Sequence, residues 1–257
     1  MICLIDTHAH LTHLDYNESE LKNVIKRMDN NIIIASGTND SDNKEVIDLV
    51  NNYENIYGVI GIHPTEIDKI SSDSYEFIEN NLNNPKIIGI GEVGLDYHYE
   101  CDKEKEKEVF IKQIELANKY HKTLVIHSRD ATKDVYDILK KYKDINTKAV
   151  IHCYSSSLEM AYEFIKLNCM LGIGGVLTFK NSKVLKDVVL NIDLKYLLLE
   201  TDSPYLAPEP YRGTKNEPYN IIYVAKKIAE IKNISLDDVL KVTTENACRQ
   251  FDLDVNL

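Results

Sequence analysis

The sequence predicts an α/β protein, a single-domain TIM-like (β/α)8 barrel that covers residues 1–257. Short apolar runs rich in β-branched residues recur along the chain, which is typical of strands buried on both faces. Amphipathic segments separate these runs, and strands that alternate with helices form parallel sheets. Several runs lead directly into His, Glu or Asp. The carboxyl ends of barrel strands are where the active sites of such barrels lie, so these residues predict a metal site there.

Eight apolar runs are expected to form the strands. In chain order they cover residues 2–5, 31–37, 57–63, 87–91, 123–126, 149–151, 169–175 and 196–199. An open, doubly wound sheet is the main alternative. Ligands at the ends of the first, middle and last strands could not converge in an open sheet, whereas closure into a barrel brings them together.

The segments between the runs are expected to be helices, because their apolar residues recur at i, i+3, i+4 and i+7. Such faces occur at 110–117, 135–142 and 158–165, and residues 221–231 and 236–251 are expected to be the closing helices. Ser156 and Glu159 have the spacing of a capping box. The Lys and Glu residues that alternate over 102–108 are interpreted as a solvated helix face rather than a nucleic-acid contact.

The composition is that of a globular enzyme, with 44% hydrophobic and 28% charged residues. The five cysteines are scattered without a CxxC pair, so we expect neither a disulfide framework nor a zinc finger. We also expect no signal peptide, no membrane span and a cytoplasmic location. The net charge of −11 argues against tight, general binding of nucleic acid. It leaves room for a nuclease whose ions and few basic residues attract the substrate locally.

Six side chains at strand ends are the candidate metal ligands. Taken singly, each has an ordinary structural explanation, such as a surface histidine, a strand-terminal ion pair or a helix N-cap. A pair of histidines two residues apart in a strand would project to the same side. Four imidazoles and two carboxylates at one end of a barrel are enough for two divalent ions, and so predict a metal-dependent hydrolase. The six are His8, His10, Glu92, His127, His152 and Asp202.

Five motifs carry these ligands: DTHAHL at 6–11, GEVGLD at 91–96, IHSRD at 126–130, HCYS at 152–155 and ETDSPYLAP at 200–208. They resemble the TatD-type metal-dependent deoxyribonucleases of the amidohydrolase-like superfamily, and the resemblance extends from Met1 to the last helix. It implies a TIM-like barrel, two divalent ions and DNase activity. Ser157 and Thr65 stand where a glycine and a histidine are usual, and neither is a proposed ligand.

The resemblance also implies how the ligands are shared. One ion would be bound by His8, His10, Glu92 and Asp202, and the other by Glu92, His127 and His152. Glu92 stands where other members of the superfamily carry a carboxylated lysine, which favours the TatD-like branch. Ligand softness favours Zn, Mn, Co or Ni, and phosphate oxygens would also allow Mg, so the identity of the ion stays open.

The expected chemistry is in-line attack of metal-activated water on a DNA phosphodiester. Glu92 would bridge the two ions, and Asp202 would take the proton from the attacking water. The resemblance implies a 3′–5′ exonuclease that acts on single-stranded or frayed ends. No obligate protein partner can be inferred, and the preference between DNA and RNA and the oligomeric state stay open.

Four further residues are expected to contact the substrate. Arg129 has the planar fork that suits a phosphate, and Arg212 could recruit the nucleic-acid backbone. His63 could contact the substrate or its leaving group, or be an outer structural residue. Tyr205 could stack on a base, or pack against the turn that follows its strand. The remaining histidines, His13, His98 and His121, are assigned no role.

Two other classes of function compete with the nuclease. The same pair of ions could hydrolyse amides, esters or small phosphoesters, including D-aminoacyl-tRNA, a reaction described for relatives. The third class is a non-catalytic metal-binding protein. A complete ligand set together with a candidate base disfavours that class.

Overall fold

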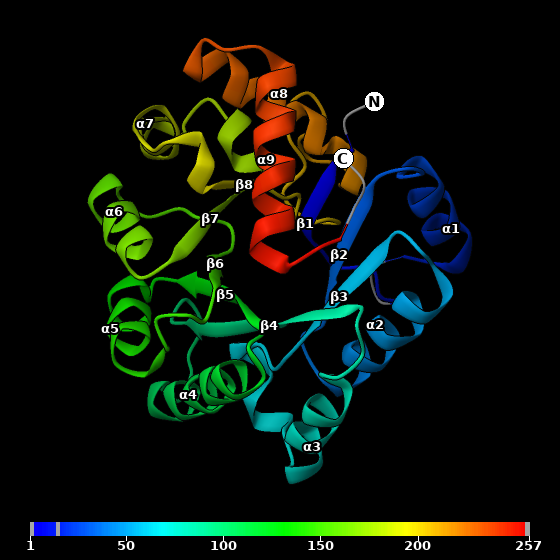
Figure 1. Cartoon of the computed structure of the whole chain (residues 1–257), viewed down its shortest axis with the longest axis vertical. Helices are drawn as coiled ribbons and strands as arrows, with labels where there is room; N and C mark the ends of the chain where they lie inside the picture. The colour runs from blue at the N-terminus through cyan, green and yellow to red at the C-terminus, as the bar shows by residue number, and fades with distance from the viewer. Residues whose placement is uncertain (1–2, 14–15, 255–257) are drawn as a thin grey trace.

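The structure, a computed structural model, describes residues 3–13 and 16–254. Eight parallel strands follow one another in the order β1 to β8 and form a nearly closed barrel surrounded by helices (Figure 1). The predicted barrel is therefore confirmed. The strands are β1 (Ile5–Ala9), β2 (Ile32–Ser36), β3 (Ile56–Ile60), β4 (Ile87–Asp96), β5 (Thr123–Arg129), β6 (Ala149–Ile151), β7 (Cys169–Ile173) and β8 (Leu197–Leu199).

Helices connect consecutive strands and close the chain. Every helical face expected from the sequence falls inside one of them. No helix within the described ranges combines the length and the apolar composition that crossing a membrane requires. The α-helices are α1 (Glu18–Arg27), α2 (Asp40–Asn52), α3 (Ser72–Asn81), α4 (Lys103–Tyr120), α5 (Thr132–Tyr142), α6 (Leu158–Lys166), α7 (Lys183–Asn191), α8 (Ile221–Lys232) and α9 (Leu236–Phe251), and the 3-10 helices are η1 (Pro64–Lys69), η2 (Gly175–Thr178), η3 (Leu194–Tyr196) and η4 (Pro218–Asn220).

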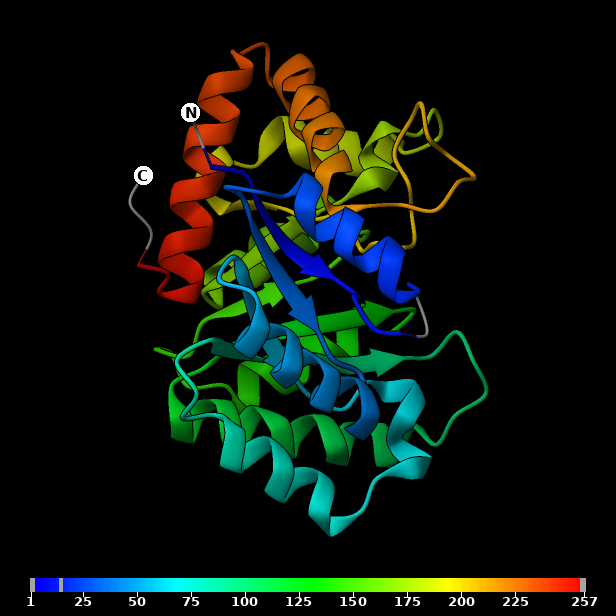
Figure 2. The ribbon, with the colours of Figure 1, turned by 90° about the vertical axis from the view of Figure 1, so that its right-hand side faces the viewer.

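Apolar side chains fill the barrel interior, and α9 covers one end of it. Figure 2 shows α9 at that end and the loops that follow β4 and β8 at the other. Because helices cover the outside of the strands while other side chains fill the inside, each strand is apolar on both faces. One buried cluster joins all eight strands to the last helix: Ile5, Ile34, Val59, Ile88, Val125, Val150, Met170 and Leu198 with Ala247 and Phe251.

Strands β8 and β1 close the barrel through an isolated bridge rather than a full ladder. Ala9 pairs with Ser203 in this bridge. Deeper in the seam, the Thr7 hydroxyl donates to the Leu199 carbonyl at 2.9 Å, and the Thr201 N–H donates to the Asp6 carboxylate at 2.9 Å. Asp6 and Thr7 of β1 are buried because they supply hydrogen bonds that close this seam.

Three strands continue further than the apolar runs predicted. β1 covers Ile5–Ala9 instead of 2–5, β4 continues to Asp96, and β5 continues to Arg129. Residue 2, where the first strand was expected to begin, lies outside the described residues. The polar extensions remain strands because their backbones keep pairing in register, as Asp96 does with Arg129. Three ligands predicted to follow strands therefore lie within them: His8, Glu92 and His127.

The expected ends of two other strands and the expected cap of one helix also need correction. β3 ends at Ile60 and β7 at Ile173, earlier than the runs 57–63 and 169–175 suggested. Helix α6 is capped by Ser157, which accepts the Met160 N–H, and not by the expected Ser156.

The segment 102–108, interpreted from the sequence as a solvated helix face, includes one buried residue. Glu106 is only 1% exposed, because α4 packs this side of its first turns against β4. Its Oε2 accepts the backbone N–H of Asp96 at 2.9 Å, so the buried carboxylate has a partner. The interpretation of this segment as wholly solvated was wrong at Glu106.

Candidate metal centre

All six predicted metal ligands converge at the carboxyl end of the barrel. They come from β1 and its end, from β4 and β5, and from the residues that follow β6 and β8. The parallel arrangement of the strands produces this convergence, because every strand delivers its last residues to the same end. The six are His8, His10, Glu92, His127, His152 and Asp202.

Four of these side chains form the first half of the centre. The Nε2 atoms of His8 and His10 are 3.2 Å apart, and each lies 3.4 Å from Oε2 of Glu92. Asp202 Oδ1 lies 3.7 Å from Nε2 of His8 and 3.4 Å from Nε2 of His10. Around an ion with bonds of about 2.1 Å, tetrahedral ligands lie about 3.4 Å from one another. The spacing of these donor atoms therefore fits a metal ion.

The other oxygen of Glu92 faces a second set of nitrogen atoms. Oε1 lies 2.9 Å from Nδ1 of His127, 3.6 Å from Nε2 of His63 and 3.9 Å from Nε2 of His152. His152 Nε2 is also 3.5 Å from Asp202 Oδ1, so this histidine lies between the two halves. One carboxylate thus presents each of its oxygens to a different group of donors.

The outward-facing nitrogens of His8 and His10 are both held by Ser36 of β2. His10 Nδ1 lies 3.2 Å from the Ser36 carbonyl oxygen, which can only accept, so Nδ1 carries a proton. His8 Nδ1 lies 3.2 Å from the Ser36 hydroxyl. In the neutral ring of His10 the lone pair therefore belongs to Nε2 and points into the centre.

A carboxylate lies beside the outward-facing nitrogen of each of the other two histidines. His127 Nε2 lies 3.0 Å from Oδ2 of Asp96, and His152 Nδ1 lies 3.1 Å from Oε2 of Glu200. Such partners fix the tautomer and the orientation of a metal-binding histidine and increase its basicity. All four histidines are therefore arranged with a donor nitrogen toward the centre.

Glu200 occupies a space that a glycine of the neighbouring strand leaves open. It is 0% exposed, and its Oε1 accepts the Cys153 N–H at 2.6 Å. A Cβ atom at Gly172 of β7 would lie 2.1 Å from Oε2 of Glu200. Glycine at position 172 is therefore required for the carboxylate to lie beside His152.

The sequence did not assign roles to these supporting residues. Asp96, the last residue of β4, and Glu200, which follows β8, both lie in the quoted motifs, and this placement was the available signal. Ser36 and Gly172 gave no such signal, because their roles depend on which strand lies next to which. All four act through contacts between strands that are distant in sequence.

Burial and charge have opposing effects on the protonation of the centre. Burial raises the pKa of Glu92, but the neighbouring histidines, His63 first among them, lower it well below its ordinary value. Burial lowers the pKa of His10, but hydrogen bonds to Asp202 and Glu92 raise it to about 10. Burial also lowers the pKa of His127, but hydrogen bonds to Asp96 and Glu92 raise it to about 9. A metal ion that binds here would displace these protons.

A cleft of about 650 Å³ lies over the centre. Three of the four residues predicted to contact the substrate line it, namely His63, Arg129 and Tyr205. Arg212 does not line it; its guanidinium lies 4.3 Å from the centre of the Phe179 ring. The prediction that Arg212 recruits the nucleic-acid backbone therefore stays a prediction, for a position outside the cleft lining.

His63 and Tyr205 were each expected either to contact the substrate or to have a structural role, and their surroundings bear on this choice. His63 Nδ1 accepts the backbone N–H of Thr65 at 3.2 Å, so the proton of the neutral ring lies on Nε2, which faces Glu92. In this tautomer His63 can donate a hydrogen bond into the cleft. The Tyr205 side chain is 54% exposed, which leaves its ring accessible.

The histidines that were assigned no role lie apart from the cleft lining within the described residues. His13 pairs with Glu45, and His98 Nδ1 lies 3.3 Å from Asp130. His121 is the exposed C-cap of α4.

Comparisons with known proteins identify relatives of this chain. Residues 5–252 match the family model described as TatD related DNase. The chain is 39% identical to the metal-dependent hydrolase YabD of Bacillus subtilis, over 96% of this chain and 98% of the relative. It is 32% identical to the metal-dependent hydrolase YcfH of Escherichia coli, over 98% and 97%. The crystal structure of the TatD homologue YJJV from Escherichia coli superimposes with a TM-score of 0.90 at 28% identity and covers 98% of this chain and 100% of that one.

Proposed function

We propose, since the chain belongs to the TatD related DNase family of metal-dependent hydrolases, that its centre hydrolyses phosphodiester bonds of DNA. We propose further that it removes nucleotides from single-stranded 3′ ends and uses two divalent ions. The observation that carries the proposal is the position of Glu92, whose oxygens face two separate sets of histidine nitrogens. Such a carboxylate can bridge a pair of ions. Centres with two ions are common among enzymes that cleave phosphodiesters.

The donor set suits divalent ions that accept both nitrogen and oxygen ligands. Four imidazoles favour Zn or Mn, while carboxylates and phosphate oxygens would also suit Mg. Bound divalent ions would supply Lewis acidity, which lowers the pKa of water and stabilises negative charge on a phosphate. The protein contributes the fixed positions of the ligands and of their hydrogen-bond partners.

Asp202 is proposed to accept the proton of the attacking water. Burial raises its pKa, but the hydrogen bond from His10 and the charges of the nearby histidines lower it below its ordinary value. Asp202 is therefore ionised at neutral pH. It lines the cleft, so its carboxylate is within reach of a water molecule beside the substrate.

Two other residues of the cleft are proposed to hold the phosphate. His63 would donate from Nε2 to a phosphate or leaving-group oxygen, in the tautomer that Thr65 stabilises. Arg129 is exposed beside His127, and its guanidinium can bind two phosphate oxygens at once. A chain end or a flexible strand can enter this cleft more readily than the interior of a duplex.

The test is the shortening of single-stranded DNA that is labelled at its 5′ end. Metal-stripped protein would be supplied with Mg, Mn or Zn, and the products would be separated by length. We expect stepwise loss of nucleotides from the 3′ end, only with metal, and its loss in Glu92→Gln. Glu115→Gln, the same change at an exposed position of α4, should leave the activity intact.

Two results would contradict the proposal. If the metal-loaded protein leaves DNA unchanged but hydrolyses D-aminoacyl-tRNA or a small ester, the hydrolase would stand and DNA would be rejected as its substrate. If Glu92→Gln shortens DNA as fast as the unaltered protein, the chemistry does not take place at this centre.

A further inference from the structure

The loops that follow β7 and β8 lie together beside the cleft, at the end of the barrel opposite α9 (Figure 2). Val176, from the first loop, and Leu206, from the second, both line the cleft. The Glu209 N–H donates to the Thr178 hydroxyl at 2.9 Å and so joins the two loops. A Cβ atom at Gly175 would lie 2.1 Å from the Leu206 carbonyl oxygen, so the backbones are in close contact. The two loops thus form one surface that continues outward from the metal centre.

This surface carries several cations that lack carboxylate partners within the described part of the chain. Lys180 and Lys183 are exposed, and neither side chain forms an ion pair with residues 3–13 or 16–254. Lys186 donates to the Phe179 carbonyl at 2.6 Å, and the Arg212 guanidinium covers the Phe179 ring. Lys183 and Lys186 lie in the first turn of α7, which follows the β7 loop. We call Lys180, Lys183, Lys186 and Arg212 the β7–β8 loop surface.

The acidic residues nearest in sequence do not neutralise these cations. Asp187 accepts a hydrogen bond from Asn191, and Glu209 is exposed; neither makes an ion pair with any described residue. Four cations against two carboxylates leave this surface positive. In a chain of net charge −11, such a local positive excess attracts anions to this part of the surface.

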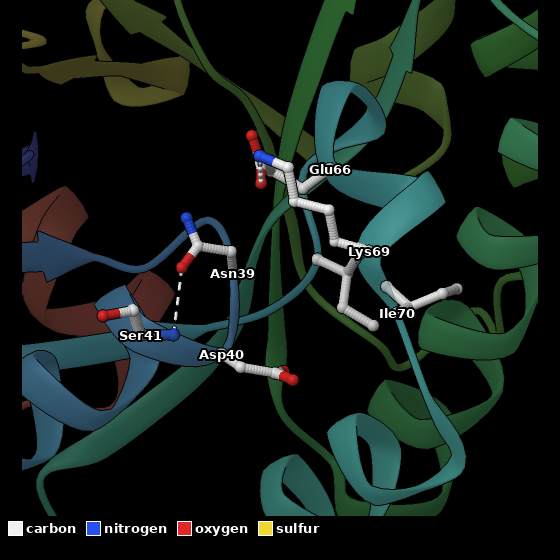
Figure 3. A pocket seen from close by; sticks show the side chains of 7 residues that line it. Asn39, Asp40, Ser41, Glu66, Lys69 and Ile70 are labelled. Carbon is white, nitrogen blue, oxygen red and sulfur yellow. Dashed lines mark hydrogen bonds and ion pairs between the residues drawn. The ribbon is translucent and has the colours of Figure 1, made fainter.

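The other side of the cleft has the opposite character. A pocket of about 200 Å³ lies between the start of α2 and η1 and shares Asn39 and Glu66 with the cleft lining (Figure 3). The Lys69 ammonium in this pocket is 2.8 Å from Glu66, so its charge is already compensated. Asp40 adds a further negative charge. Phosphates would be repelled from this side, and a polyanion leaving the centre would be directed toward the β7–β8 loop surface.

We propose that the β7–β8 loop surface binds the phosphate backbone of a single-stranded polynucleotide whose end lies at the metal centre. The proposal rests on the proposed function and adds to it the path of the substrate. Exposed lysines on a surface next to the cleft would pair with phosphates a few nucleotides away from the reacting bond. Each such pair releases counterions, which makes the binding depend on salt. The surface gives Arg212 a role remote from the reacting bond.

The test uses the full-length protein and a double charge reversal, Lys180→Glu with Lys183→Glu. The matched control is Lys140→Glu with Lys141→Glu, two exposed lysines at the end of α5 that leads into β6, which form no ion pair with a residue that the structure describes. Each protein would be assayed with single-stranded DNA of about twelve nucleotides, long enough to cover a typical binding site. Bis(p-nitrophenyl) phosphate would serve as a small phosphodiester that reaches only the centre.

We expect the Lys180/Lys183 variant to raise KM for the DNA roughly tenfold at about 50 mM salt. Loss of two phosphate contacts lowers the slope of log KM against log salt by about 1.4, so the difference from the unaltered protein shrinks about sevenfold between about 50 and 200 mM. The Lys140/Lys141 control should keep the original KM. Turnover of bis(p-nitrophenyl) phosphate should be the same in all three proteins.

An equal KM and an equal salt slope in the Lys180/Lys183 variant and its control would overturn the proposal and leave the nuclease function standing. DNA binding itself would be followed by fluorescence anisotropy of a labelled strand. If the unaltered protein binds DNA but hydrolyses only the small ester, the nuclease proposal fails. A loss of DNA binding confined to the Lys180/Lys183 variant would still support the proposal that the β7–β8 loop surface binds the phosphate backbone.

Discussion

Replacement of Gly172 by alanine should weaken metal binding although residue 172 is not a ligand. The new Cβ atom would lie 2.1 Å from Oε2 of Glu200 and 2.6 Å from its Cδ. An ordinary contact needs about 3.4 Å or more, so the carboxylate would have to move by roughly 1 Å. That movement would break the 3.1 Å contact with His152 Nδ1.

The expected size of the effect follows from what the partner of a metal-binding histidine contributes. Loss of such a partner typically lowers metal affinity about 10- to 100-fold, or about 1.4–2.7 kcal/mol. The added methyl group would also lower the free energy of unfolding by about 1–3 kcal/mol, because it overfills a packed site. The protein should remain folded at room temperature and bind its ions more weakly.

The assay is competition for Zn²⁺ between the protein and a chromophoric chelator, with circular dichroism to confirm that the protein is folded. Gly174→Ala is the matched control, since its Cβ atom would approach Glu200 no closer than 3.6 Å. Glu200→Gln, which keeps the shape of the side chain, should reproduce the loss of affinity. If folded Gly172→Ala and Glu200→Gln bind Zn²⁺ as tightly as Gly174→Ala does, Glu200 does not support metal binding by His152.

Three further predictions follow from the centre and its supports. Glu92→Gln should lower the number of ions per chain, measured by mass spectrometry of the metal content; an unchanged number would rule out a bridging role. His10 and His127 have pKa values raised to about 10 and about 9, so in the metal-free protein their stabilising contribution is complete below pH 6.5 and lost as pH rises toward 9–10. Urea unfolding of metal-free protein should show that decline, and calorimetry in buffers of different ionisation enthalpy should show proton release on metal binding; a flat profile with no release would contradict the assignment. Gln113→Leu should cost about 2–4 kcal/mol in urea unfolding, because Gln113 bonds both the N–H and the carbonyl of Ile62; a cost below about 0.5 kcal/mol would show that water replaces both bonds.

The sequence predicted the barrel, and the six predicted ligands converge in it for a physical reason. Once the apolar runs form parallel strands of a barrel, the residues at their carboxyl ends meet at one end of it. The family resemblance is confirmed by the match of residues 5–252 to the family model. The sharing of the ligands between two ions stays a proposal.

The boundaries of the strands could not be read from hydropathy. β1 and β4 continue through polar residues such as Asp6 and Glu92, because cross-strand hydrogen bonds or the centre itself satisfy those side chains. For the same reason Glu106 looked like part of a solvated helix face. A buried polar residue whose partner is distant in sequence has the same local pattern as an exposed one.

The residues that orient the predicted ligands could not be predicted from the sequence for a related reason. The roles of Ser36, Glu200 and Gly172 depend on distances between neighbouring strands, which no spacing along the chain reveals. The position of Arg212 away from the cleft depends on how its loop folds against Phe179. Sequence patterns therefore identified the six side chains that converge at the end of the barrel, but not the residues that orient them.

The most direct test of the proposed two-ion centre is the anomalous scattering from crystals of this protein grown with Mn²⁺. Two anomalous peaks, one on each side of the Glu92 carboxylate, are the predicted result. One peak should adjoin His8, His10 and Asp202, and the other should adjoin His127. A single peak, or peaks away from Glu92, would contradict the two-ion centre.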